Sequence, residues 1–272
     1  MRAFYRTHEV YTGGFLEIDT YPVFQPLSLS TGRAVRRGRC RPSSEAQTLL
    51  NRRRAETKFR RLVNANFGDG DYGVDITFRR GCQPKDDDDA KRIIGNYMDR
   101  LRRKYKRAGI EMRYILVAAH GEVSGRYHYH LFITGGISRD VIEDTWGFGR
   151  VNCRRLQWDE DDGISGIAEY FLKQAEVFGK RWCGSRNLIQ PQERVDDYKM
   201  TRSDAHRCLD SFGAAAEVAR RLYPGWELCA IPRSIANDLN GGAYITLRLR
   251  RRGTRSHGSA RGARTRRKRK IL

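Results

Sequence analysis

Two apolar runs of strand length stand six residues apart near the middle of the chain. Residues 112–120 read MRYILVAAH and residues 127–134 read YHYHLFIT, with the polar stretch 121–126 (GEVSGR) between them. A connection this short between two apolar runs is typical of an antiparallel hairpin. Any fold of this chain must therefore be built around a pair of antiparallel strands.

A strongly amphipathic helix is predicted just before this hairpin. Residues 86–105 begin with four aspartates and become basic toward their end, a charge order that complements the helix dipole. Apolar residues recur at three- and four-residue steps and form one stripe: Ile93, Ile94, Tyr97, Met98, Leu101 and Tyr105. The helix therefore has one face to bury against a sheet.

The other predicted elements follow the same two periods. They are helices at 44–65 (with a Ser44–Gln47 capping box), 138–146 and 164–175, and strands at 72–78 and 149–156. This order predicts an α+β fold in which helices flank one central, mainly antiparallel sheet.

By composition the chain divides into four predicted parts. They are a loosely structured leader (1–42), a domain that holds the helices and strands above (43–195), an extension packed on that domain (196–247), and a disordered basic tail (248–272).

Positive charge dominates the composition. The chain has 53 Lys and Arg against 32 Asp and Glu, a formal net charge of +21, and twelve of the basic residues lie in 248–272, where no acidic residue occurs. This imbalance favours an anionic partner, first nucleic acid and second a membrane surface. The tail is expected to bind phosphates; its alternative interpretation is a segment that only increases solubility.

No stretch of the sequence predicts a membrane span or a secretory signal. The apolar runs are short, and the N-terminal MRAFYRTHEVYTGG lacks the apolar centre of a signal peptide. The six cysteines are widely spaced, without a Cys-x-x-Cys pair, which argues against a zinc ribbon or a disulfide framework. We expect a soluble, cytoplasmic protein with reduced thiols.

The second strand of the hairpin carries a His-x-His pair. His128 and His130 share one face of the strand, so their imidazoles can converge on one ion. A divalent metal needs further ligands. If position 120 lies opposite position 128, His120 is the third ligand; Glu122, an oxygen donor suited to Mg²⁺ or Mn²⁺, is the competing choice. The alternative is a pair of strand histidines satisfied by hydrogen bonds.

A tyrosine lies on the shoulder of the helix predicted at 164–175. At about 100° per residue, Tyr170 falls about 60° outside the apolar arc, on the side that also carries Lys173. The ammonium can therefore lie beside the phenol or beside a group that the phenol attacks. A Tyr-x-x-Lys pair is common, and a boundary tyrosine without chemistry is the alternative interpretation.

Taken in order, these motifs resemble those of the HUH endonucleases, named for His, a bulky hydrophobic residue and His, and above all the rolling-circle replication initiators of single-stranded DNA phages, prophages and plasmids. The resemblance runs from Asn64 to about Pro191. It rests on NANF with VDITF (64–78), the histidine strands (114–130), YFLK (170–173) and the basic segment KRWCGSRNL (180–188). One nucleophilic tyrosine is evident, as in the single-tyrosine branch.

The resemblance implies an antiparallel sheet with flanking helices, similar to an RNA-recognition motif, and a site-specific single-stranded DNA nickase and strand transferase. It implies Mg²⁺ or Mn²⁺ held by His128, His130 and either His120 or Glu122. Tyr170 would attack the scissile phosphate, leaving a 5′-phosphotyrosyl link and a free 3′-hydroxyl.

The same resemblance implies roles for several basic residues and a set of partners. Lys173 would steady the phosphate or lower the pKa of the phenol. DNA contacts are expected from Arg181, Arg186, Arg266, Arg267 and Lys268. The substrate would be single-stranded or origin DNA, with a host polymerase and other replication proteins as partners in the cytoplasm of a bacterial host cell.

Other functions stay open at this point. A noncatalytic nucleic-acid-binding protein of the same architecture predicts that Tyr170→Phe leaves DNA-dependent behaviour unchanged. A relaxase or a transposase would use the same chemistry in another biological role. A basic virion protein would explain the tail but not the clustered histidines.

Overall fold

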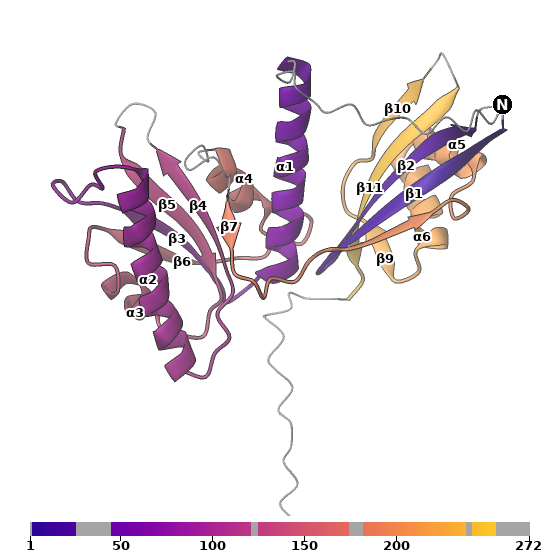
Figure 1. The fold of residues 1–272 in the computed structure, drawn as a ribbon. Helices are drawn as coiled ribbons and strands as arrows, with labels where there is room; N and C mark the ends of the chain where they lie inside the picture. The colour runs from indigo at the N-terminus through magenta and orange to yellow at the C-terminus, as the bar shows by residue number, and fades with distance from the viewer. Residues whose placement is uncertain (1, 26–44, 121–124, 174–181, 238–240, 254–272) are drawn as a thin grey trace, which may run out of the picture.

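The strands of the protein form two antiparallel sheets, with α1 standing between them (Figure 1). The computed structural model describes residues 2–25, 45–120, 125–173, 182–237 and 241–253. One sheet has five strands and the other has six. Helices cover both faces of the five-stranded sheet and one face of the six-stranded sheet.

The five-stranded sheet holds the predicted hairpin at its centre. Its order is β6 (Val151–Arg155), β3 (Tyr72–Thr77), β5 (Tyr127–Ile133), β4 (Tyr114–His120) and β7 (Cys183–Gly184). On one face pack α2 (Asp87–Arg107) and α3 (Arg139–Asp144), and on the other α1 (Glu45–Asn66) and α4 (Ser165–Lys173). The residues on β5 are therefore enclosed from both sides.

The amphipathic helix α2 forms where its sequence predicts. The Asp86 side chain caps its first turn by accepting a hydrogen bond from the Asp89 backbone N–H at 2.8 Å. The whole predicted apolar stripe is buried, and Tyr97 and Leu101 are 0 % exposed. Burial of this stripe against β3, β4 and β5 fixes one face of the sheet.

The opposite face of the five-stranded sheet packs on α1 and α4. Phe59 and Val63 of α1 and Phe171 of α4 lie in one buried cluster with Phe132 of β5. The Phe132 ring centroid is 4.8 Å from that of Phe171 and 6.2 Å from that of Phe59. This cluster places α4 directly over the histidine strand.

The six-stranded sheet joins the two ends of the described chain. Its order is β10 (Arg233–Asn237), β11 (Gly242–Arg251), β2 (Phe15–Gln25), β1 (Arg2–Thr12) and β8 (Gln192–Asp196), with β9 (Trp226–Leu228) paired to β11. On one face pack α5 (Arg202–Asp210) and α6 (Phe212–Leu222). This sheet therefore has a hydrophobic core of its own.

These observations confirm the α+β class and an antiparallel sheet with flanking helices, and they add a second sheet that the sequence analysis does not anticipate. The loosely structured leader is wrong for residues 2–25, which form the β1–β2 hairpin. Alternation is blurred there because Thr7 and Glu9 are buried on the face that α5 and α6 cover; Glu9 accepts hydrogen bonds from Tyr11 and Lys199.

The boundary of the basic tail at 248 is also wrong, because β11 continues to Arg251. Arg248 pairs with Asp162, and Arg250 pairs with Asp161 at 2.8 Å, so these charges are used inside the fold. The strands and helices of 196–251 join β1 and β2 instead of packing as an extension on the five-stranded sheet. The division into four parts otherwise stays a prediction.

Among the described residues, no helix combines the length and the apolar character that crossing a bilayer requires.

Candidate active site

The histidine pair lies at the centre of the five-stranded sheet, on the face toward α1 and α4. The ring centroids of His128 and His130 are 5.2 Å apart. His130 is buried and stacks on Phe171 of α4, with 4.4 Å between ring centroids. Tyr129 points to the other face, where its hydroxyl donates to the Ala90 carbonyl at 2.9 Å. The alternation along β5 thus places both imidazoles on one face, as the sequence predicts.

The predicted register of the hairpin is wrong by one residue. The loop is closed by His120 and Tyr127, the last residue of β4 and the first of β5, so Ala119 is the residue opposite His128. Opposed residues of an antiparallel pair share a face, so His120 faces away from the histidine pair; its ring meets that of Tyr127 edge-on at 4.6 Å. Glu122, the alternative ligand, lies outside the described residues.

An acidic residue that the sequence analysis gives no role lies beside His130. Asp75 is directly opposite His130 on β3; its Oδ1 lies 2.7 Å from His130 Nδ1, and its Oδ2 accepts a hydrogen bond from Arg154 at 2.6 Å. Burial opposes ionisation, but the hydrogen bond from His130 and the Arg154 guanidinium hold the pKa of Asp75 below its ordinary value. An acid between Val74 and Ile76, in a buried alternating strand, is the signal that could have found it.

Helix α4 brings Tyr170 to the same place. The Tyr170 ring centroid lies 5.8 Å from that of His130. The Tyr170 side chain is 51 % exposed, whereas Phe171 is buried, which is the shoulder position that the helical period predicts. Lys173 is exposed one turn further, on the same side of α4. The structure therefore brings an exposed phenol to the edge of the two imidazoles.

The start of α4 is fixed by α1. Asn64, buried near the end of α1, accepts a hydrogen bond from the Ile164 N–H at 3.1 Å and donates one to Ser165 Oγ at 3.0 Å. Gly163 has a φ of +65°, and a Cβ there would lie 2.8 Å from Asn64 Oδ1, so this position requires glycine. Arg248 of β11 also donates to Ser165 Oγ at 3.3 Å. Both α1 and the six-stranded sheet therefore position the tyrosine helix.

Of the residues predicted to contact DNA, Arg186 lies in the described part of the chain. It is exposed and lines a cavity of about 660 Å³ with Arg102 and Lys106 of α2. Tyr114, the first residue of β4, lines the same cavity, so Arg186 lies at the end of the sheet opposite His120. The other predicted contacts lie outside the described residues: Arg181, Arg266, Arg267 and Lys268.

Two imidazoles on one face can supply two nitrogen donors to a divalent ion. Holding Nδ1 of His130 with the Asp75 carboxylate is the arrangement by which proteins direct Nε2 of a histidine toward a metal. Within the described ranges, no group of three or more His, Cys, Asp and Glu side chains could hold a metal. The histidine pair therefore fits a half-site whose other positions water or a substrate phosphate would fill.

The region that contains these residues is similar to a known family. Residues 74–175 match the model of the ORF2 family of replication-associated proteins. The matched region begins in β3 and includes the histidine pair, Tyr170 and Lys173, but it spans less than half of the chain. No curated protein and no solved structure matches the chain. The similarity is consistent with a replication initiator.

Proposed function

We propose that this chain is a replication initiator that cleaves one strand of DNA with Tyr170 as the nucleophile. The observation that carries the proposal is the convergence of His128, His130 and an exposed Tyr170 over one face of the sheet, with 5.8 Å between the Tyr170 and His130 rings. All three residues lie in the region similar to the replication-associated proteins. The half-exposed phenol is accessible to a phosphate that approaches from solvent.

The proposed reaction is a transesterification. The Tyr170 hydroxyl oxygen attacks the phosphorus, the bond from phosphorus to the 3′ oxygen breaks, and the phenolic proton ends on that oxygen. The products are a 5′-phosphotyrosyl strand and a free 3′-hydroxyl that a polymerase can extend. Lys173 would stabilise the negative charge that develops on the phosphate. Because the phosphotyrosyl link keeps the energy of the broken bond, rejoining or strand transfer needs no nucleotide.

His128 and His130 are the residues that would hold Mg²⁺ or Mn²⁺. Bound there, the ion would polarise a non-bridging oxygen of the scissile phosphate. Asp75 fixes the orientation of the His130 ring from one side and Phe171 packs against its face from the other. His120 is not included in this ligand set, because it faces the opposite side of the sheet.

Formation of a covalent adduct tests this function. The protein is incubated with a single-stranded oligonucleotide library and Mn²⁺, and the products are separated on a denaturing gel. We expect a protein–DNA adduct from the wild type, from Tyr198→Phe, whose ring is 90 % exposed and remote in sequence, and none from Tyr170→Phe. An adduct that forms normally in Tyr170→Phe, or none with any divalent metal, would overturn the proposal.

The same experiment separates the main alternative. A noncatalytic DNA-binding protein would give no adduct from any variant while still retaining the oligonucleotides on a native gel. A relaxase or a transposase would give the same adduct, because it uses the same chemistry. The choice of a replication initiator among these rests on the similarity of residues 74–175.

A further inference from the structure

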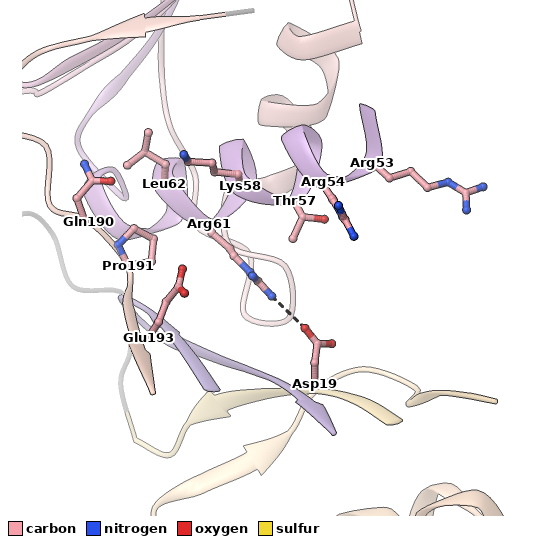
Figure 2. A pocket seen from close by; sticks show the side chains of 10 residues that line it. All are labelled: Asp19, Arg53, Arg54, Thr57, Lys58, Arg61, Leu62, Gln190, Pro191 and Glu193. Carbon is pink, nitrogen blue, oxygen red and sulfur yellow. Dashed lines mark ion pairs between the residues drawn. The ribbon is translucent and has the colours of Figure 1, made fainter. Parts of the chain in front are cut away.

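Helix α1 presents two chemically different sides to the two sheets. Its apolar side, with Phe59 and Val63, packs on the five-stranded sheet. Arg53, Thr57 and Arg61 recur at four-residue steps on another side, which faces the six-stranded sheet. Between that side and the sheet lies a cavity of about 630 Å³ (Figure 2). The residues that line it are Asp19, Arg53, Arg54, Thr57, Lys58, Arg61, Leu62, Gln190, Pro191 and Glu193.

The cavity carries an excess of positive charge. Its acidic residues have partners: Asp19 lies 3.6 Å from Arg61 and accepts a hydrogen bond from Thr246, and Glu193 lies 3.2 Å from His8. The three exposed cations at its rim, Arg53, Arg54 and Lys58, form no ion pair with any residue that the structure describes. Their charges therefore favour an anion in the cavity.

The floor of the cavity continues along β2 onto a sheet face that α5 and α6 do not cover. Tyr21 follows Asp19 by two residues, so it lies on the same face. Tyr244 of β11 is 38 % exposed and pairs with Ile235, which is 70 % exposed. Arg6 is directly opposite Tyr21 on β1. Half-exposed aromatic rings beside a cationic wall are what proteins use to hold single-stranded nucleic acid.

We propose that the groove between α1 and the uncovered face of the six-stranded sheet binds single-stranded DNA without sequence preference. Arg53, Arg54 and Lys58 contact successive phosphates, and bases stack on Tyr21 and Tyr244. The cavity volume is that of a small-ligand pocket, so it accepts nucleotides of one strand and excludes a duplex. This binding needs neither a metal nor Tyr170, and so goes beyond the proposed function.

Fluorescence anisotropy of a labelled oligothymidylate of about 16 nucleotides tests the groove. The titration is made in EDTA over a range of salt concentrations, with residues 254–272 present in every variant. We expect the triple variant Arg53→Gln, Arg54→Gln, Lys58→Gln to bind at least tenfold more weakly. Its slope of log affinity against log salt should be smaller by about 2, because three phosphate contacts are lost.

A matched control changes the same charge on the far side of the five-stranded sheet. Arg103→Gln, Lys104→Gln, Arg107→Gln alters the end of α2, and we expect less than a twofold change in affinity and an unchanged salt slope. Binding by the groove variant as tight as by this control, with the same slope, would overturn the proposal.

The aromatic floor is tested by the pair Tyr21→Ala, Tyr244→Ala, with folding checked by thermal melting. We expect at least a fivefold loss of affinity for the oligothymidylate. An unchanged affinity, or tighter binding of a duplex of equal length by the wild type, would contradict a single-strand groove. Because no covalent step occurs in EDTA, these results are independent of whether Tyr170 is a nucleophile.

Discussion

At the scale of single residues, Asp75 links the histidine pair to the rest of the sheet. Its carboxylate is 2.7 Å from His130 Nδ1 and 2.6 Å from the Arg154 guanidinium. A histidine held in this way has one orientation and one preferred tautomer, which a metal ligand needs. The sequence motif His-x-His does not contain this partner, because it comes from a neighbouring strand more than fifty residues earlier.

The first prediction concerns this carboxylate. Asp75→Asn removes the negative charge but keeps the shape of the side chain, so we expect a folded protein. The Mn²⁺ concentration that gives half-maximal adduct formation should rise by about 10- to 100-fold. Asp88→Asn, a 92 % exposed acid on α2, is the control and should leave the metal titration unchanged. Coinciding titrations of the two variants would show that Asp75 does not orient a metal ligand.

At the scale of elements, α1 decides where the tyrosine helix begins. The Asn64 side chain satisfies the Ile164 N–H and contacts Ser165, and both bonds are buried. Since α4 has nine residues, a shift at its first turn is carried to Tyr170. The contact therefore connects the end of one helix to the position of the proposed nucleophile.

The second prediction removes this contact. Asn64→Ala leaves the buried Ile164 N–H without its partner, and we expect the free energy of unfolding to fall by about 1–3 kcal/mol. The initial rate of adduct formation should fall as well, because α4 loses its anchor. Urea unfolding and a time course of adduct formation measure the two effects.

Asn51→Ala is the control for this substitution. Asn51 is exposed on the same helix, so its replacement should cost about 0.5 kcal/mol or less and leave the rate unchanged. Equal stability and equal rate in the two variants would contradict the anchoring role of Asn64.

The predictability of these elements follows from how their polar residues are used. In α2 the polar residues are exposed, so both the helix and its Asp86 cap can be predicted from the sequence. In β1, Glu9 is buried and paired with Lys199, which lies far along the chain, so hydropathy hides the strand. The register at His120 could not be predicted, because a polar six-residue loop does not specify which residues close it.

At the scale of the whole molecule, α1 is held between the two sheets by buried charge. Glu17 of β2 is 4 % exposed and accepts hydrogen bonds from Arg60 at 2.8 Å and Arg61 at 2.7 Å. On the other side, Phe15 stacks on Trp158 with 5.4 Å between ring centroids. These contacts join the six-stranded sheet to the elements that carry the proposed active site.

The third prediction concerns the pH dependence of this junction. Burial raises the pKa of Glu17, but Arg60 and Arg61 outweigh it, so the pKa in the folded protein lies below its ordinary value of 4.5. The carboxylate therefore stabilises the fold fully above about pH 4.5, and this stabilisation is lost as the pH falls through the lower folded-state pKa.

Glu17→Gln should be less stable at pH 7 by about 3–5 kcal/mol, because two buried guanidinium groups lose their partner. Its melting temperature should also change less than that of the wild type between pH 6 and acidic pH. Glu217→Gln, which removes an exposed pair with Arg207, is the control. Melting curves of wild type and Glu17→Gln that shift in parallel with pH would exclude this role.

The most direct test of the proposed chemistry is the mass of the peptide that carries the nucleophile. Trypsin releases Leu156–Lys173, in which Tyr170 is the one tyrosine. After reaction with a single-stranded oligonucleotide and nuclease trimming, we predict that this peptide gains the mass of a 5′-phosphoryl nucleotide on Tyr170. A covalent adduct that maps to any other residue, or this peptide recovered unmodified from protein that has cleaved DNA, would contradict the account.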